Sequence, residues 1–558
     1  MDRVAAVIHP QHVPIAGALI TLALLGCGQH PLALSGRADV ITVRVAEGDY
    51  RDLSVGVSTT KGLYVAARRR SDAALTVIQA EPFSECVVGK TLWHGTLFVE
   101  DQAKLMMLQA GTNASDAALR FADTDCRVDD LSVLRVAPPF NVWGTQKASE
   151  FTFSMHTVDG DLVFVKPFEG KKSPIASGTW DSQRSKHGLW VGEGQELVLR
   201  DDDGKELIRT GKAVKRFALE ARNKEVAYED GNVIERAEIT NQQLDKLQRV
   251  DTGCEMRFMA RGPRSELAYY APCDKDRKHT PESKLIVQHL AEGRREYAAN
   301  IRSYRHFFDA NLVQNIVYQL ASQELWLDGP ALPQPVRIGG NAPLGNVFSN
   351  PAKSALFALV DRVAQQSEEV YAGRLIRFTP EGSVTLAEGL ESFKLLPSRT
   401  RHVPGNVTKI PSTFKMAALW FQKPLPPPAG SSKRKELYDV AVVDARALDE
   451  GRVRPLLEPR SVPANGMRYV WGAEVPAVAY LDKWQFEDDA PGGPDHGRLN
   501  VWLQDTNEHF VIDEHVSEFM PVSAPQRGLL YTVTDPKRNG IWFALLHKPC
   551  ATPLECYL

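Results

Sequence analysis

The fold is decided by a stretch near the end of the chain, Arg527-Gly528-Leu529-Leu530-Tyr531-Thr532-Val533-Thr534-Asp535-Pro536-Lys537-Arg538-Asn539-Gly540-Ile541-Trp542-Phe543-Ala544-Leu545. Two apolar runs rich in Leu, Tyr and Trp flank a segment of Asp, Pro, Asn and Gly, the residue types that favour turns. Short β-forming runs joined by such a turn are a strong local signal for an antiparallel hairpin. The stretch therefore predicts two paired strands.

The first of these runs belongs to a motif that recurs along the chain. One or two polar residues, often with Gly, precede four or five apolar or aromatic residues and a turn. The copies lie at residues 61–65, 104–108, 150–153, 187–191, 225–228, 266–269, 324–327, 354–357, 416–420, 475–480 and 527–531. The first six are spaced by about 37 to 45 residues, the range expected of propeller blades. The later five are spaced irregularly, by about 32 to 61 residues, which indicates insertions between strands.

Most copies are followed by a turn and a second strand. Asp201-Asp202-Asp203-Gly204 and Asp230-Gly231-Asn232 are examples of these turns. Long helical periodicity is nearly absent, and only residues 360–370 suggest a short helical turn. The chain is therefore predicted to be all-β.

Repeated strand–turn–strand units resemble the blades of TolB-type and WD-type β-propellers. Residues 523–531 followed by Gly540-Ile541-Trp542 look most like a TolB-type blade, although neither family's full signature is present. The resemblance implies four-stranded antiparallel blades, because small sheets bury both faces only when they pack in a closed ring. A pair of β-sandwiches is the competing architecture, and the number of similar units disfavours it.

Eleven copies exceed the 4–8 blades of an ordinary ring. We therefore favour two tandem propellers, over residues 39–292 and 311–558, with a joint at 293–310. The alternative is one ring of seven or eight blades with long insertions. Residues 423–436, Pro-rich and then basic, are expected to be an exposed insertion.

The N-terminal segment resembles a bacterial lipoprotein signal. An apolar run of 11 residues, Ile15 to Leu25, is too short for a membrane-spanning helix and ends in the lipobox-like Leu24-Leu25-Gly26-Cys27. This resemblance implies removal of residues 1–26, lipid on Cys27 and a tether over residues 27–38. A plain signal peptide or a buried helix is the alternative. The implied location is the bacterial cell envelope, at the outer membrane, on its periplasmic or surface side.

Composition excludes some classes of partner. The 558 residues are 43% hydrophobic and 24% charged, with a formal net charge of −3. Such a balance gives no general electrostatic attraction for nucleic acid. The length exceeds what one hydrophobic core usually supports, which favours two domains or a repeat architecture.

Cysteine usage agrees with export. Besides Cys27, six cysteines form three couples that are close in sequence: Cys86 with Cys126, Cys254 with Cys273, and Cys550 with Cys556. Six cysteines allow 15 pairings, so these disulfides are predicted from proximity alone. Buried free thiols are the alternative, and zinc would require closer Cys spacing.

No catalytic or cofactor motif emerges from the sequence, and the chain contains no G-x-S-x-G elbow. His496, His509 and His515 lie near Glu508, Asp513 and Glu514, but the spacing favours solvated side chains over a metal site. Tryptophans within apolar runs are expected to pack between blades: Trp190, Trp326, Trp420, Trp502 and Trp542. Trp471 and Trp484 flank a predicted strand and are candidates for a binding surface.

Two functions remain. The first is a non-catalytic binding or scaffolding propeller that contacts an envelope protein or polysaccharide and uses no cofactor or metal. The second is a propeller enzyme acting on a glycan or peptide, whose carboxylates would converge from several blades and leave no sequence motif. We favour the first.

Overall fold

The computed structural model describes 29 segments of the chain between residues 40 and 546. These are residues 40–58, 62–80, 83–99, 102–110, 117–129, 134–135, 141–143, 151–157, 161–185, 187–201, 203–220, 224–231, 233–240, 243–259, 266–276, 278–289, 293–308, 314–329, 332–349, 354–365, 367–379, 381–396, 417–422, 437–463, 466–470, 477–486, 495–503, 507–522 and 528–546. The lipobox-like segment, the tether, the Pro-rich insertion 423–436 and the Cys550–Cys556 couple lie outside them.

Strands dominate the described residues, and seven sheets of four antiparallel strands form the first part of the chain. Blade 1 contains β2 (Tyr50–Ser58), β3 (Gly62–Arg69), β4 (Ala74–Ala80) and β5 (Phe83–Lys90). Blade 2 contains β6 (Trp93–Val99), β7 (Gln102–Ala110), β8 (Ala117–Ala122) and β9 (Leu134–Arg135). Blade 3 contains β10 (Asn141–Trp143), β11 (Thr152–His156), β12 (Leu162–Lys166) and β13 (Lys171–Ala176). Blade 4 contains β14 (Thr179–Ser185), β15 (Gly188–Glu193), β16 (Glu196–Arg200) and β17 (Glu206–Arg209).

The next three blades repeat this order. Blade 5 contains β18 (Val214–Leu219), β19 (Glu225–Asp230), β20 (Val233–Thr240) and β21 (Gln243–Thr252). Blade 6 contains β22 (Cys254–Met259), β23 (Glu266–Cys273), β24 (His279–His289) and β25 (Gly293–Ala299). Blade 7 contains β26 (Ile301–Phe308), β27 (Gln314–Leu320), β28 (Leu325–Asp328) and β29 (Val336–Gly339).

Two seven-stranded sheets complete the architecture, and each divides into two blades at a 15-residue strand. Blades 8 and 9 contain η2 (Leu344–Asn346), β30 (Val347–Ser349), β31 (Leu356–Gln365), β32 (Ser367–Thr379), β33 (Gly382–Leu396), β34 (Ala417–Gln422), β35 (Leu437–Asp444), α1 (Ala445–Asp449) and β36 (Pro455–Pro463). Blades 10 and 11 contain β37 (Met467–Val470), β38 (Ala477–Gln485), β39 (His496–Leu503), β40 (Glu508–Val522), β41 (Gly528–Val533), β42 (Gly540–Leu546) and β1 (Val40–Glu47). β33 and β40 each form the last strand of one blade and continue as the first strand of the next.

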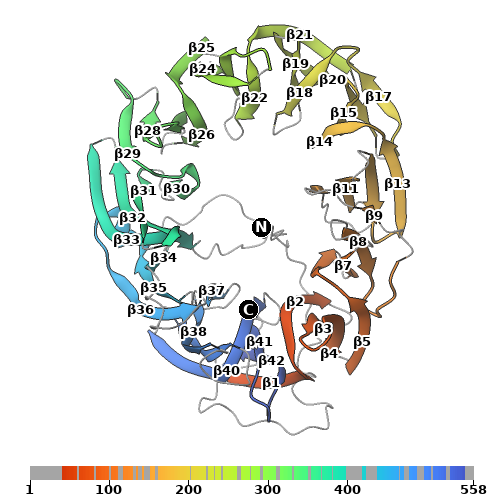
Figure 1. Cartoon of the computed structure of the whole chain (residues 1–558), viewed down its shortest axis with the longest axis vertical. Helices are drawn as coiled ribbons and strands as arrows, with labels where there is room; N and C mark the ends of the chain where they lie inside the picture. The colour runs from red at the N-terminus through yellow and green to blue at the C-terminus, as the bar shows by residue number, and fades with distance from the viewer. Residues whose placement is uncertain are drawn as a thin grey trace, which may run out of the picture.

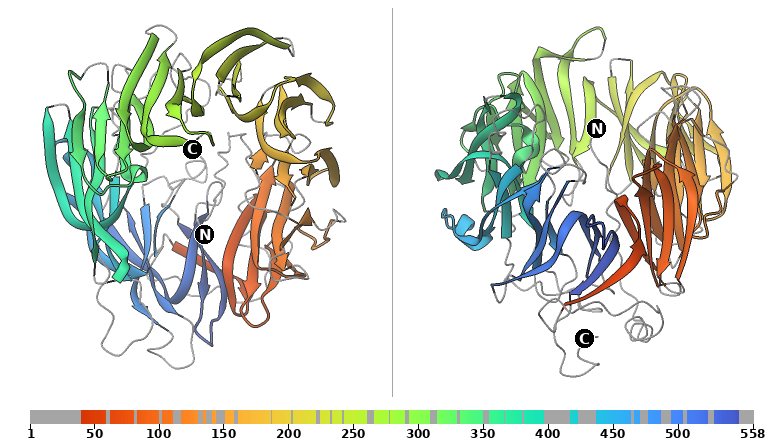
Figure 2. Two further views of the ribbon diagram at one scale, coloured as in Figure 1. Left: turned by 45° about the horizontal axis from the view of Figure 1, so that its top comes forward. Right: turned by 60° about the horizontal axis from the view of Figure 1, so that its bottom comes forward.

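The eleven blades of the described chain form one ring. Figure 1 shows them side by side around a common centre, with the first strand of each blade on the inner side and the last at the outer rim. The two tilted views in Figure 2 show the same single ring. Buried apolar clusters join every blade to the next, including blade 11 to blade 1.

The apolar motif is explained by this packing. Successive side chains of a strand point to opposite faces of its sheet. On β23, Leu267 and Tyr269 pack in the cluster shared with blade 5, while Ala268 and Tyr270 pack in the cluster shared with blade 7. Both faces are buried, so the strand is a continuous apolar run instead of an alternating one.

Each blade contains one copy of the motif. Ten copies lie in or lead into the second strand of a blade, and the copy at 324–327 lies in the third strand, β28. The all-β propeller predicted from the sequence is therefore confirmed. The number of copies equals the number of blades. From the sequence, the same count of eleven copies had favoured a division of the chain into two rings.

Three details of the prediction are corrected. The structure has one ring in place of two, and its eleven blades also exceed the alternative of seven or eight. Residues 293–308 hold β25 and β26, which end blade 6 and begin blade 7 as ordinary neighbours, so no joint between rings lies there. Residues 360–365 and 367–370 belong to the paired strands β31 and β32 instead of a helical turn, and Leu359 and Leu375 pair beside them in a buried core.

The ring is closed by pairing of a strand near one end of the described chain with a strand near the other end. β1 pairs antiparallel with β42, from Val40 opposite Leu546 to Glu47 opposite Gly540. The strand nearest the N-terminus thus supplies the outermost strand of the last blade. The backbone hydrogen bonds of this ladder join the two ends of the described chain within one blade.

Candidate functional site: a charged row on the inner strands

The first strands of blades 4 to 7 share an irregularity near their beginning. Their register with the second strand shifts between Thr179 and Asp181, Val214 and Phe217, Cys254 and Arg257, and Ile301 and Ser303. A bulge adds a residue and re-aims the side chains around it. These four strands, β14, β18, β22 and β26, follow one another along the inner side of the ring (Figure 1).

Polar and aromatic side chains in these bulges or shortly after them form a set that we call the inner row. Its members are Trp180 on β14, Lys215 and Arg216 on β18, Glu255 and Arg257 on β22, and Arg302 and Arg305 on β26. The five cations of the row are exposed, and its one carboxylate is partly buried. The row is therefore strongly basic within a chain whose formal net charge is −3.

Three arginines of the row reach from one blade to the next. Arg216 Nη1 lies 3.9 Å from Glu255 Oε1 on blade 6. Arg257 donates to the carbonyl oxygen of Tyr304 on blade 7 at 2.5 Å, with its guanidinium 3.6 Å from the centre of that tyrosine ring. Arg305 donates to the carbonyl oxygen of Val347 on blade 8 at 3.4 Å. These contacts hold the guanidinium groups in place along the row.

Glu255 is fixed from both sides. Its backbone lies in the left-handed region with φ of 54°, and its N–H donates to the buried carboxylate of Glu229 at 2.9 Å. Its side chain contacts His279, with 2.8 Å between Oε2 and Nδ1, and accepts from the His279 backbone N–H at 3.2 Å. Such a carboxylate orients an imidazole ring and selects its tautomer.

The rings beside this pair are packed closely. His279 stacks on Tyr270, with centroids 4.6 Å apart, and Tyr270 meets Tyr304 edge to face at 6.0 Å. Burial raises the pKa of Tyr270, and it raises the pKa of Tyr304 to about 12 while Arg257 acts in the opposite direction. Both phenols are therefore neutral at physiological pH.

Trp180 marks the end of the row on blade 4. Its indole lies against Gly192, where an added Cβ would be 2.1 Å from the ring, so only glycine leaves room for it. The ring also meets Phe217 edge to face, with centroids 5.9 Å apart. Even so, 37% of the residue is exposed. A rigidly held, exposed indole is typical of a binding surface.

Two of the three predicted disulfides are confirmed. Cys254 and Cys273 join β22 to β23 within blade 6, next to Glu255. Cys86 and Cys126 join the outer strand of blade 1 to the turn after β8 in blade 2. The first bond ties together the strand ends that carry Glu255 and Tyr270, which favours a fixed site.

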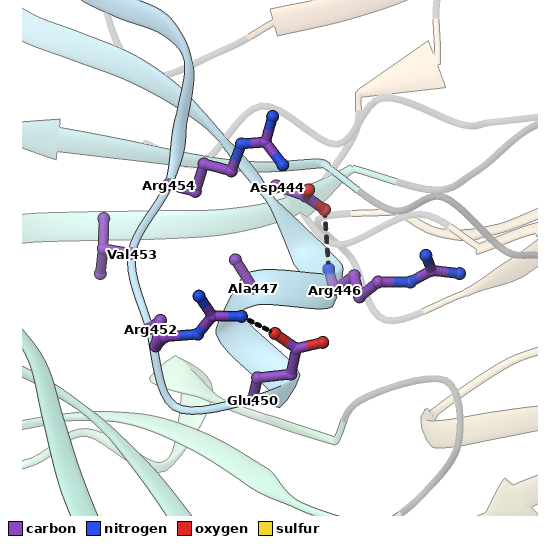
Figure 3. Close-up of a pocket in the computed structure, with 7 residues that line it drawn as sticks. All are labelled: Asp444, Arg446, Ala447, Glu450, Arg452, Val453 and Arg454. Atoms are coloured by element: carbon purple, nitrogen blue, oxygen red, sulfur yellow. Dashed lines mark hydrogen bonds and ion pairs between the residues drawn. The ribbon is translucent and has the colours of Figure 1, made fainter.

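A separate pocket of about 390 Å³ lies on blade 9 beside α1 (Figure 3). It is lined by Asp444, Arg446, Ala447, Glu450, Arg452, Val453 and Arg454. Asp444 caps the helix by accepting from the Arg446 backbone N–H, and Glu450 pairs with Arg452. Both carboxylates are thus used by local contacts, and we assign this pocket no ligand.

The three histidines considered in the sequence analysis, His496, His509 and His515, do not form one cluster. His496 and His515 meet with ring centroids 4.8 Å apart, while His509 lies 3.4 Å from the hydroxyl of Tyr480. Asp513 is engaged by Arg538 and Tyr531. Over the described residues, no group of three His, Cys, Asp or Glu side chains is placed to hold a metal ion.

Some of the predicted tryptophan positions are confirmed and others are not. Trp190, Trp502 and Trp542 are fully buried between blades, as expected, and Trp326 is half-buried. Trp484 packs against the core of blades 10 and 11, so its place on a binding surface is not supported. Trp471 and the side chain of Trp420 lie outside the described residues. The sequence analysis missed Trp180, because it stands alone in a polar strand.

Comparison with known proteins yields structural likeness only. No protein-family model matches the chain, and no curated protein matches it. Similar solved structures include a eukaryotic initiation factor, with 10% identity, a TM-score of 0.39 and coverage of 74% of this chain and 97% of that one. The WD40 domain of SCAP from fission yeast has 9% identity, a TM-score of 0.28 and coverage of 73% and 95%. Dihydro-heme d1 dehydrogenase NirN has 11% identity, a TM-score of 0.33 and coverage of 66% and 82%.

These scores carry no argument about function, which rests here on the residues of the chain itself. Among the helices of the described segments, none is long and apolar enough to cross a membrane.

Proposed function

We propose that this protein is a lipid-anchored module of the bacterial cell envelope that binds a partner through the inner row without converting it. The observation that carries the proposal is the row itself, with cationic side chains from three successive blades and an exposed indole on a fourth. Side chains held by a packed scaffold lose little conformational entropy on binding. A closed ring with fixed side chains is suited to docking a partner.

The location is supported by two separate features of the chain. The lipobox-like Leu24-Leu25-Gly26-Cys27 implies a lipid on Cys27. The disulfides Cys86–Cys126 and Cys254–Cys273 are typical of oxidising compartments outside the cytoplasm. Together they favour attachment at the outer membrane, facing the periplasm or the cell surface.

Lipidation is tested by metabolic labelling. Cells given a labelled fatty acid are expected to incorporate the label into the wild-type chain, and Cys27→Ala is expected to abolish it. Cys86→Ala is the matched control, because it removes a cysteine without touching the lipobox. Label retained in Cys27→Ala would remove the anchor from the proposal.

Binding is tested by affinity capture from envelope extract with the full chain in detergent. The wild type is expected to recover envelope material that a Lys215→Ala/Arg302→Ala variant does not recover. Lys90→Ala/Arg249→Ala removes the same two charges from the outer strands β5 and β21 and is expected to behave as wild type. Equal recovery by all three proteins would show that the row is not the docking surface.

A second candidate function has one specific observation in its favour. The Glu255–His279 pair has the arrangement of a carboxylate and an imidazole in general acid–base catalysis, and Arg216 lies beside it. An enzyme of this kind would turn over a glycan or peptide library, and His279→Gln and Glu255→Gln would each lower the rate at least tenfold. Binding without turnover by the wild type favours the first proposal.

A further inference from the structure

We infer that the inner row recognises an anionic polysaccharide whose charges repeat along its length. This inference rests on the proposed binding function and specifies its ligand. The cations of the row differ from paired cations at the outer rim of the ring, such as Arg209 and Lys246.

Two cations at the outer rim are paired with carboxylates of their own blade. Arg209 on β17 lies 2.5 Å from Glu196 and 2.6 Å from Glu206. Lys246 on β21 lies 2.9 Å from Glu238 on β20. At Arg209 and Lys246 these pairs compensate the positive charge.

Cations of the row are placed differently. Arg257 and Arg305 donate to backbone carbonyl oxygens, which leaves their positive charge uncompensated by a carboxylate. Lys215 and Arg302 have no ion-pair partner within the described segments, and both are exposed. Only Arg216 lies near a carboxylate, that of Glu255, at 3.9 Å. The row therefore keeps a positive charge that an anion can neutralise.

The charges recur from blade to blade. Packed sheets lie on the order of 10 Å apart, so successive first strands offer cations at roughly that interval. Lys215 and Arg216, then Arg257, then Arg302 and Arg305 occupy three consecutive blades. A polymer with an anionic group on each repeating unit matches such a series better than a single small anion does.

Trp180 favours a sugar polymer over other polyanions. Its exposed indole lies one blade before Lys215 and Arg216, and Gly192 and Phe217 fix its orientation. The flat apolar face of an indole suits the C–H face of a sugar ring, and a tryptophan fixed this way loses little entropy on contact. A polyuronic acid supplies both the ring and a carboxylate on each unit.

The test uses the full chain in detergent and immobilised polygalacturonate, with dextran as the neutral counterpart. Wild type is expected to bind polygalacturonate and not dextran, with an affinity that falls as salt screens the charges. Lys215→Ala/Arg302→Ala is expected to weaken binding at least tenfold. Lys90→Ala/Arg249→Ala, which removes two outer-rim charges, is expected to leave it unchanged. Trp180→Ala should weaken binding to polygalacturonate and not binding to poly-L-glutamate, which has no sugar ring.

The inference is overturned if dextran binds as well as polygalacturonate, or if the Lys215/Arg302 variant binds polygalacturonate normally. Binding of poly-L-glutamate or single-stranded DNA that is tighter than binding of polygalacturonate would also overturn it, because the row would then recognise negative charge without a preference for a polyuronic acid. Capture of an envelope protein that depends on the row, without polygalacturonate binding, would refute the ligand and leave the binding function standing. Failure of both measurements would refute both proposals.

Discussion

Two junctions of the ring are built in different ways. Blades 6 and 7 meet chiefly through buried side chains, among them Tyr270, Tyr297, Ile301, Tyr304 and Tyr318. Blade 11 is completed by a backbone ladder between β1 and β42, and it meets blade 1 through a buried apolar cluster. Side chains reinforce that ladder, and Gly540 is required in it, since an added Cβ would lie 2.1 Å from the carbonyl oxygen of Ala46.

The closing blade also contains a buried polar network. Arg538 donates to Asp513 at 2.9 and 2.7 Å, and the Tyr531 hydroxyl donates to the same carboxylate at 3.2 Å. Trp542 donates to the carbonyl oxygen of Arg538 at 3.0 Å. The junction of blades 6 and 7 combines an apolar cluster with the side-chain contacts Arg257–Tyr304 and Arg295–Asp328. The closure adds a backbone ladder, which fixes its register.

The largest effect is expected at the closure. Trp542→Ala removes a fully buried indole and should lower the free energy of unfolding by about 3–5 kcal/mol. Trp180→Ala removes an indole that is 37% exposed and should cost less, about 1–2 kcal/mol. Chemical denaturation of the two variants checks the difference. Equal losses would contradict the claim that the closing blade is stabilised by its buried core.

A smaller effect is expected from the polar network of the closure. Asp513→Ala leaves the Tyr531 hydroxyl without its acceptor and Arg538 without its carboxylate, so a loss of about 2–3 kcal/mol is expected. Tyr531→Phe removes only one hydrogen bond to Asp513 and should cost about 1 kcal/mol. Thermal unfolding at neutral pH measures both. A loss from Asp513→Ala no larger than that from Tyr531→Phe would show that Arg538 contributes nothing.

The smallest effect is expected at the junction of blades 6 and 7. The buried Tyr304 hydroxyl has no hydrogen-bond partner in the described structure, so Tyr304→Phe should change stability by less than about 1 kcal/mol at pH 7. Burial raises the pKa of Tyr304 to about 12, above the usual value near 10. The neutral phenol therefore contributes stability below pH 10 that is lost as the pH rises from 10 towards 12.

Thermal unfolding as a function of pH measures this contribution. Between pH 10 and 11 the wild type should lose about 1 kcal/mol more than Tyr304→Phe, since one pH unit corresponds to 1.36 kcal/mol per proton. Parallel curves for the two proteins over this range would contradict the burial of Tyr304 at the junction.

Local patterns were enough to predict the type of fold. Second strands such as β23 are apolar runs buried on both faces, and sequences such as Asp230-Gly231-Asn232 are typical of hairpin turns. Ring size was not predictable in this way, because it depends on which distant strands pair. Nothing in residues 40–47 specifies β42 as a partner instead of a strand near residue 295.

The candidate site was harder to predict than the fold. Arg216, Arg257 and Arg305 are separated by about 41 to 48 residues and belong to no motif. Arg216 lies in a bulge and Arg257 directly follows one, and a bulge depends on a single shift of register that composition does not reveal. The signal that was present is positional: each arginine lies in the strand that precedes an apolar second strand.

The most direct test of the single closed ring is a disulfide across its closure. Val43 and Phe543 are register partners in β1 and β42, so cysteines at both positions lie within bonding reach. Val43→Cys/Arg295→Cys places the second cysteine on β25, the last strand of blade 6, where a first ring of six blades would close. In Val43→Cys/Phe543→Cys, peptide mapping without reduction is expected to recover residue 43 linked to residue 543. In Val43→Cys/Arg295→Cys, it is expected to recover no link between residues 43 and 295. Recovery of residue 43 linked to residue 295, with no link to residue 543, would contradict the eleven-bladed ring.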